Sequence, residues 1–153
     1  MVALSKCITS ELIAFLDTDQ RNDTIEALIE RAAAAKKVGD LAGFRQAIHR
    51  REEVVSTGIG MGVAIPHAKV DTCPDFFIAI GILSKGVAWE SLDQQPVRLV
   101  FLIGGPDDKP TEYLQLLSHL TMLMKDEEQR KQLLQLKTAE QVVDFFTEKE
   151  LSD

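Results

Sequence analysis

The sequence is poor in cysteine. Its 153 residues contain two, Cys7 and Cys73, which lie far apart and belong to no C-x-x-C pair and no Cys/His cluster. Small secreted domains are held together by several disulfides, and zinc sites need grouped ligands, so neither class of protein fits this chain. We expect both thiols to be reduced, and we expect no metal and no other cofactor.

Long apolar runs are also missing. No stretch approaches the ~20 apolar residues that span a bilayer. The first residues, MVALSKCITSELIAF, lack the charged, then apolar, then small-residue order of a secretory signal. We therefore expect a cytoplasmic protein with no stable membrane insertion.

Positive charge is scarce as well. Lys and Arg total 17 against 24 Asp and Glu, which gives a formal net charge of −7. Proteins that bind nucleic acids concentrate Lys and Arg because these side chains displace counterions from the phosphates. The composition therefore argues against a nucleic-acid partner.

What remains is an ordinary globular composition, with 45% apolar and 27% charged residues. A chain of this length can bury one sizeable core, and no internal repeat, low-complexity segment or long linker divides it. We expect a single domain over residues 1–153.

The first third of the chain predicts one strand and two helices. Residues 12–17, LIAFLD, form a short apolar run typical of a strand. Asp23 and Glu26 have the spacing of a helix N-cap, and apolar residues then recur at helical intervals until Gly39. Asp40 can cap a second helix that ends near Val55.

The rest of the chain predicts strands followed by helices. Three runs rich in branched and aromatic residues, at 63–70, 76–83 and 97–105, indicate neighbouring strands. The last two runs are almost continuously apolar, which is typical of a sheet covered on both faces. Helical patterns follow at 111–124, 126–136 and 138–148. This order predicts an α/β fold, a three-layer α/β/α sandwich.

A glycine-rich segment, STGIGMG, lies between the helical and extended parts. A glycine backbone can adopt positive φ and point its amides at an anion, so phosphate is a natural ligand. The spacing matches neither G-x-x-x-x-G-K-[ST] nor G-x-G-x-x-G, and a nucleotide fold is not indicated. The segment alone also fits an ordinary turn. The candidate phosphate-binding residues are Ser56, Thr57, Gly58, Gly60 and Gly62.

His67 follows this segment directly after a proline. A nucleophile that accepts a phosphoryl group and passes it on needs a neutral ring nitrogen near pH 7, which an imidazole of pKa about 6.5 supplies. We expect the second ring nitrogen to be hydrogen-bonded, so that the attacking one keeps its lone pair. On spacing alone, a half-buried structural histidine is the more common interpretation of such a residue.

The whole stretch REEVVSTGIGMGVAIPHAKV, residues 51–70, resembles the signature of the fructose, mannitol and nitrogen-regulatory enzyme IIA proteins of the bacterial phosphotransferase system. The resemblance implies a mixed sheet between helix layers, phosphorylation of His67 by the phosphocarrier HPr, and transfer to a IIB domain or a role as a regulatory mark. It also places Arg51 at the family's arginine position, where a guanidinium stabilises phosphoryl oxygens.

The match departs from the family at one functional position. Many members carry a second histidine beside the active one, and an ungapped alignment puts Tyr113 there. A phenol of pKa about 10 donates a hydrogen bond but does not share a proton near pH 7. Tyr113 equally fits a core aromatic.

For HPr docking, we consider Ile59 and Met61 as exposed apolar candidates near His67.

Three functions remain open. We favour the nitrogen-regulatory type, because no IIB or IIC segment is fused to the 153-residue chain. The alternatives are a sugar-specific IIA component and a binding module that keeps the fold without turnover, for which Tyr113 is the support. Ser-His-Asp chemistry does not fit, since no G-x-S-x-G elbow occurs.

Overall fold

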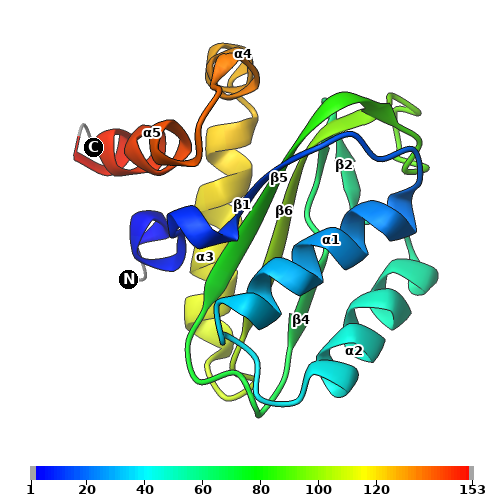
Figure 1. Cartoon of the computed structure of the whole chain (residues 1–153), viewed down its shortest axis with the longest axis vertical. Helices are drawn as coiled ribbons and strands as arrows, with labels where there is room; N and C mark the ends of the chain where they lie inside the picture. Colours follow the sequence, from blue (N-terminus) through cyan, green and yellow to red (C-terminus); the bar gives the residue numbers. More distant parts are fainter. Residues whose placement is uncertain (1–2, 152–153) are drawn as a thin grey trace.

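The computed structural model describes residues 3–151 and has three layers, with a sheet between two groups of helices (Figure 1). The predicted α/β/α sandwich is therefore confirmed. In chain order the elements are the short helices η1 (Leu4–Cys7) and η2 (Ser10–Leu12), β1 (Ile13–Leu16), α1 (Arg21–Ala34), α2 (Leu41–Val54), β2 (Gly58–Gly60), β3 (Val63–Ala64), β4 (His67–Lys69), β5 (Phe77–Val87), β6 (Val97–Gly105), α3 (Pro110–Met124), α4 (Glu127–Gln135) and α5 (Ala139–Leu151).

The sheet is mixed, as the family resemblance implied. Its order is β1-β5-β6-β3-β2, and β5 and β6 form an antiparallel pair at its centre. Two short strands share the outer edge of β6, both parallel to it: β3 pairs at Leu99 and Val100, and β4 pairs further along at Ile103. The chain thus leaves β3 at Ile65 and returns to the same edge at His67.

Both faces of the sheet are covered. Alternate side chains of β5 and β6, such as Ile80 and Phe101, pack under α3, α4 and α5, while Ala79 and Leu102 face α1 and α2. This two-sided burial explains why both strands are almost continuously apolar. In Figure 1, α1 and α2 lie on one side of the sheet and α3 to α5 on the other.

The second helix begins as predicted, since the Asp40 side chain accepts a hydrogen bond from the Gly43 N–H at 3.0 Å. The first helix differs at both ends. It starts at Arg21, so Asp23 lies inside its first turn rather than at the cap. It stops at Ala34, well before Gly39, because Lys36 adopts a left-handed φ of 58° and the Lys37 N–H donates to the Ala32 carbonyl at 3.0 Å.

The glycine segment forms a hairpin rather than a plain turn. Residues 58–60 make the strand β2, which is antiparallel to β3. Met61 and Gly62 connect the two strands with φ values of 61° and 76°, the double positive φ that a tight hairpin requires. The amides of this segment are therefore arranged by strand pairing.

Two further expectations concern cysteine and the membrane. Cys7 and Cys73 are both buried as thiols, and burial raises the pKa of the Cys73 thiol to about 11. Within residues 3–151, no helix has both the length and the apolar character needed to cross a bilayer.

Candidate active site around His67

His67 opens β4 and is held by the backbone on both sides. His67 pairs with Ile103 of β6, and the carbonyl of the preceding residue, Pro66, accepts the Ile103 N–H at 2.9 Å. The ring Nδ1 lies 2.8 Å from the Ile65 carbonyl oxygen. Because a carbonyl can only accept, Nδ1 carries the proton and Nε2 keeps its lone pair. The expected partner of the second ring nitrogen is thus the Ile65 backbone.

The surroundings of His67 disfavour its charged form. The ring is partly buried, and this burial is the main reason why its pKa lies below the ordinary value of 6.5. The positive charges of Arg51 and Lys69 lower the pKa further, while the Ile65 hydrogen bond and the Glu52 carboxylate act in the opposite direction. The ring is neutral at pH 7, which is the form a nucleophile needs.

This lowered pKa gives a first prediction. The His67 ring is expected to titrate with a midpoint below 6.5, because burial and two nearby cations oppose its protonation. Its nucleophilic form therefore persists on acidification and is lost only as the pH falls through the lowered pKa. NMR titration of the ring protons measures the midpoint, and a value at or above 6.5 would contradict this account.

Arg51 lies in the last turn of α2, close enough for its charge to act on His67. Its Nη1 donates to the Val55 carbonyl at 2.8 Å, which anchors the guanidinium at the point where the helix ends. The remaining N–H groups of the fork are suited to an anion. Its charge acts on the pKa of both His67 and Tyr113, so the structure brings these three residues together.

Tyr113 is a buried aromatic residue whose ring lies beside that of His67. It is a core residue, 5% exposed, in the first turn of α3, and its ring centroid lies 5.8 Å from that of His67 at an angle of 45°. The Lys69 Nζ sits 4.6 Å from the tyrosine ring centroid. Burial raises the pKa of Tyr113 to about 12. Its hydroxyl is buried and has no hydrogen-bond partner within residues 3–151.

The glycine segment binds protein acceptors through several of its amides. The Thr57 N–H donates to Glu52 at 2.6 Å, the Gly58 N–H to the Ser56 hydroxyl at 3.1 Å, and the Met61 N–H to Asp93 at 2.9 Å. Ser56 in turn donates to the Trp89 carbonyl at 2.5 Å. A phosphate bound by these particular amides would have to displace existing partners.

The backbone conformation and close packing of this segment require glycine at three positions. A Cβ on Gly58 would overlap the Ser91 hydroxyl, and Gly60 and Gly62 adopt φ values of 91° and 76°. The segment fits closely against the loop that joins β5 to β6.

The two candidate docking residues differ in exposure. Ile59 is half-buried and packs against the core beneath α3 to α5, while Met61 is 37% exposed. Val63 pairs with Leu99 and His67 with Ile103, four residues further along β6. At about 3.3 Å per residue, Met61 lies more than ~13 Å from His67 along the sheet.

Sequence reasoning did not consider three exposed apolar residues that neighbour Arg51 or Tyr113 in the chain. Val54 and Val55 follow Arg51 at the end of α2 and are 82% and 57% exposed, and Leu114 follows Tyr113 and is 61% exposed. Their signal in the sequence was adjacency to the two residues already singled out.

Comparison with known proteins places these features in a family. Residues 6–149 match the model described as phosphoenolpyruvate-dependent sugar phosphotransferase system, EIIA 2. The chain is 36% identical to the fructose-specific EIIABC component of Bacillus subtilis over 133 residues, which cover 87% of this chain but only 21% of that longer protein. It is 31% identical to the fructose-specific EIIA component of Haloferax volcanii, over 84% of this chain and 83% of the relative.

Regulatory proteins are similar as well. A nitrogen regulatory protein of Bradyrhizobium diazoefficiens is 30% identical, over 80% of this chain and 79% of its own length. Among solved structures, the nitrogen regulatory protein IIA-Ntr of Neisseria meningitidis superimposes with a TM-score of 0.87 at 23% identity, covering 93% and 97% of the two chains. Mannitol IIA of Escherichia coli, solved in complex with phosphorylated IIB, gives 0.78 at 20% identity, covering 92% and 96%. The fold, the His67 motif and the match over residues 6–149 agree, and the chain belongs to the EIIA 2 family of the phosphoenolpyruvate-dependent sugar phosphotransferase system.

Proposed function

We propose that this protein is a cytoplasmic phosphoryl carrier that accepts a phosphoryl group from HPr on Nε2 of His67 and hands it on. The observation that supports this most directly is the 2.8 Å contact between Nδ1 and the Ile65 carbonyl, which leaves Nε2 as the nitrogen with a lone pair. The lowered pKa of His67 keeps that nitrogen unprotonated at pH 7.

The transfer is an in-line exchange between two imidazoles. The Nε2 lone pair of His67 forms a bond to phosphorus as the P–N bond of phospho-HPr breaks, and the bonding electrons return to the donor ring. The proton on Nδ1 stays in place, where the Ile65 carbonyl stabilises the positive charge that develops on the ring. Delivery to an acceptor protein reverses these bond changes.

Arg51 and Tyr113 are the residues we assign to the phosphoryl oxygens. The Arg51 fork retains donors beyond its bond to Val55, and the Tyr113 hydroxyl is a buried donor without a partner within residues 3–151. We prefer these two groups to the amides of residues 56–62, because the Thr57, Gly58 and Met61 N–H groups already bind protein acceptors. A role for the glycine segment in holding phosphate would require those bonds to open.

Replacing Tyr113 with phenylalanine tests this assignment. We expect the rate of phosphorylation by phospho-HPr to fall by about 2- to 10-fold, the worth of one hydrogen bond. The buried ring and its packing against His67 stay in place. Tyr113→Leu, which also removes the aromatic contact, is the comparison for packing. An unchanged rate in Tyr113→Phe would show that the hydroxyl does not contact the phosphoryl group.

The partner-docking surface is the apolar rim of the site, which we define as Val54, Val55 and Leu114, with Met61 at a greater distance. The three rim residues are more than half exposed and lie within four residues of Arg51 or Tyr113 in the chain, and both of these residues are close to His67. Exposed apolar groups around a reactive residue are typical of transient protein interfaces. HPr and a IIB domain or regulatory target would use this rim in turn, since each must reach Nε2.

Aspartate substitutions distinguish the rim from the hairpin turn. Leu114→Asp is expected to slow charging by HPr by roughly 10-fold, because it puts a charge into an apolar contact at the centre of the interface. Met61→Asp is expected to slow charging less, since its strand position is more than ~13 Å from His67. Initial rates at sub-saturating HPr measure both, and an unchanged rate in either variant removes that residue from the dock.

The direct test of carrier function is incubation with phosphoenolpyruvate, enzyme I and HPr. We expect phosphate on the protein that is labile to acid and stable to base, as phosphohistidine is. If no such phosphate forms, the chain is a binding module that keeps the fold, and the carrier proposal fails.

Among carriers, we propose the nitrogen-regulatory type, with a sugar-specific IIA component as the alternative. Relatives of both kinds match at 30–36% identity. Adding fructose- and mannitol-type IIB domains to the phosphorylated protein separates the two. Rapid loss of phosphate to a IIB domain supports the sugar-specific type, whereas retention supports a regulatory mark.

A further inference from the structure

A buried carboxylate, Glu52, lies next to Arg51 in the chain. Glu52 is 5% exposed, and it is the only charged side chain among the buried polar residues of the described chain. It follows Arg51 in the last turn of α2. A buried charge is costly unless several donors surround it, so its presence at this position calls for an explanation.

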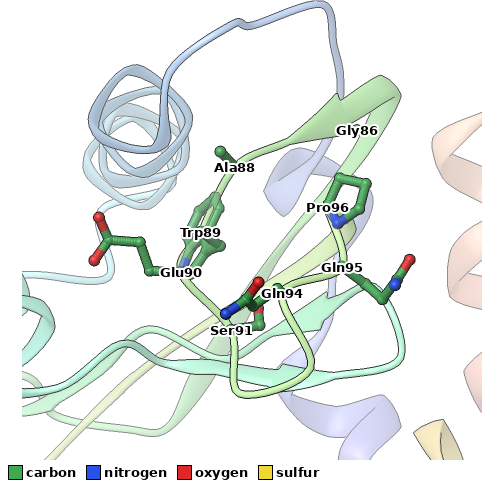
Figure 2. Close-up of a pocket in the computed structure, with 8 residues that line it drawn as sticks. All are labelled: Gly86, Ala88, Trp89, Glu90, Ser91, Gln94, Gln95 and Pro96. Carbon is green, nitrogen blue, oxygen red and sulfur yellow. The ribbon is translucent and has the colours of Figure 1, made fainter.

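Glu52 joins three segments of the chain. One carboxylate oxygen accepts the Thr57 hydroxyl at 2.6 Å and the Trp89 indole N–H at 2.9 Å, and the other accepts the Thr57 backbone N–H at 2.6 Å. Trp89 comes from the loop between β5 and β6, where Glu90 and Gln95 point to opposite sides (Figure 2). The end of α2, the start of the glycine segment and this loop are thus fixed to one another.

The same contacts continue to the reactive ring. The Thr57 carbonyl accepts the Ile65 N–H at 3.0 Å, and the Ile65 carbonyl accepts Nδ1–H of His67 at 2.8 Å. Thr57, which Glu52 binds, is therefore connected to the His67 ring through the two hydrogen bonds of Ile65, and the second of these bonds fixes the tautomer of the ring. On its other side, Glu52 fixes the helix end from which Arg51 extends.

We propose that Glu52 is a positioning residue of this site. It fixes the positions of the Ile65 carbonyl and Arg51, so that His67 presents Nε2 to the phosphoryl group. It does not touch the phosphoryl group. Glutamine cannot replace it, because the three donors need two acceptor oxygens and an amide offers only one. One donor would then face an N–H group, and the segment carrying Thr57 would shift. The effect of Glu52 on phosphoryl transfer rests on the proposed function, but its effect on the His67 tautomer does not.

The test compares Glu52→Gln with Glu53→Gln, a matched change at the next residue, which is exposed. Two measurements are made on each variant and on the wild type. Long-range ¹H–¹⁵N NMR of unphosphorylated protein reports the His67 tautomer. Steady-state phosphorylation by phospho-HPr reports the maximal rate and the KM for HPr.

We expect Glu52→Gln to convert the single Nδ1–H tautomer into a mixture and to reduce the maximal rate by about 10- to 100-fold, the usual effect of removing a group that orients a functional histidine. The KM for HPr should change less than the maximal rate, since Glu52 is buried and does not itself contact HPr. Glu53→Gln should match the wild type. An unchanged tautomer and rate in Glu52→Gln would overturn the proposal, as would an equal effect of Glu53→Gln.

Trp89→Phe keeps the test decisive if Glu52→Gln does not fold. It removes one donor to Glu52 and leaves the carboxylate and both Thr57 bonds. We expect a partial tautomer shift and a rate about 3-fold lower, and the absence of both would overturn the proposal. If wild-type protein takes no phosphate while Glu52→Gln still alters the tautomer, the carrier function is wrong and the positioning role stands.

Discussion

His67→Ala is expected to abolish phosphorylation by phospho-HPr, with a loss of more than about 10⁴-fold in the rate. No other described group combines the features of this ring, which are a fixed Nδ1 proton, a lowered pKa and an adjacent guanidinium. The measurement is transfer of radiolabelled phosphate from phosphoenolpyruvate through enzyme I and HPr, followed by acid and base treatment of the product.

His49→Gln is the control for the loss of a histidine. His49 lies on α2, where its Nε2 contacts the Glu26 carboxylate at 2.8 Å, and it takes no part in the site. This variant should be phosphorylated like the wild type. Acid-labile phosphate that persists in His67→Ala would show that another residue carries the group, and the mechanism above would then be wrong.

Arg51→Ala is expected to reduce the transfer rate by about 10²- to 10³-fold, as does the loss of one preorganised donor to developing charge in other enzymes. The phosphoryl group spreads negative charge over its equatorial oxygens in the transition state, and a planar fork beside His67 can bind two of them. Arg51→Lys keeps the charge but not the fork, so its rate should lie between those of alanine and arginine. Single-turnover transfer from phospho-HPr is the measurement that isolates this step.

Arg50→Ala serves as the matched control, because Arg50 is the preceding residue of the same helix and is exposed. It alters the net charge equally, so general effects on attraction to HPr appear in both variants. If the two substitutions slow transfer to the same extent, Arg51 acts through long-range charge and not through contact with phosphoryl oxygens.

Much of the fold could be predicted because local signals agreed with the final packing. The strand at 97–105 lies between two prolines and is apolar except for Arg98, and the structure has the same bounds. Asp40 caps α2 through its own side chain, a short-range effect that the sequence contains in full. The predicted end of α1 was wrong. The run of alanines before Lys36 favours a longer helix, and nothing in the local sequence indicates the left-handed conformation of Lys36.

The family resemblance predicted that Arg51 and Tyr113 lie beside His67, and the structure brings these three residues together. The role of Glu52 was not predicted, because a glutamate in an R-R-E-E run is normally solvated, and its burial depends on Trp89 from a distant loop. Long-range packing decides such cases, and single-sequence patterns do not contain it.

The break between β3 and β4 has a consequence for how this site tolerates mutation. Residues 65 and 66 stand between two strands on one edge of β6, so the Ile65 carbonyl faces the imidazole and not a neighbouring strand. The group that orients the ring belongs to the main chain, and no change of side chain at position 65 can delete it. Substitutions at position 65 that keep the core volume are therefore expected to leave the ring oriented, whereas an insertion or deletion between residues 64 and 67 is expected to misalign it.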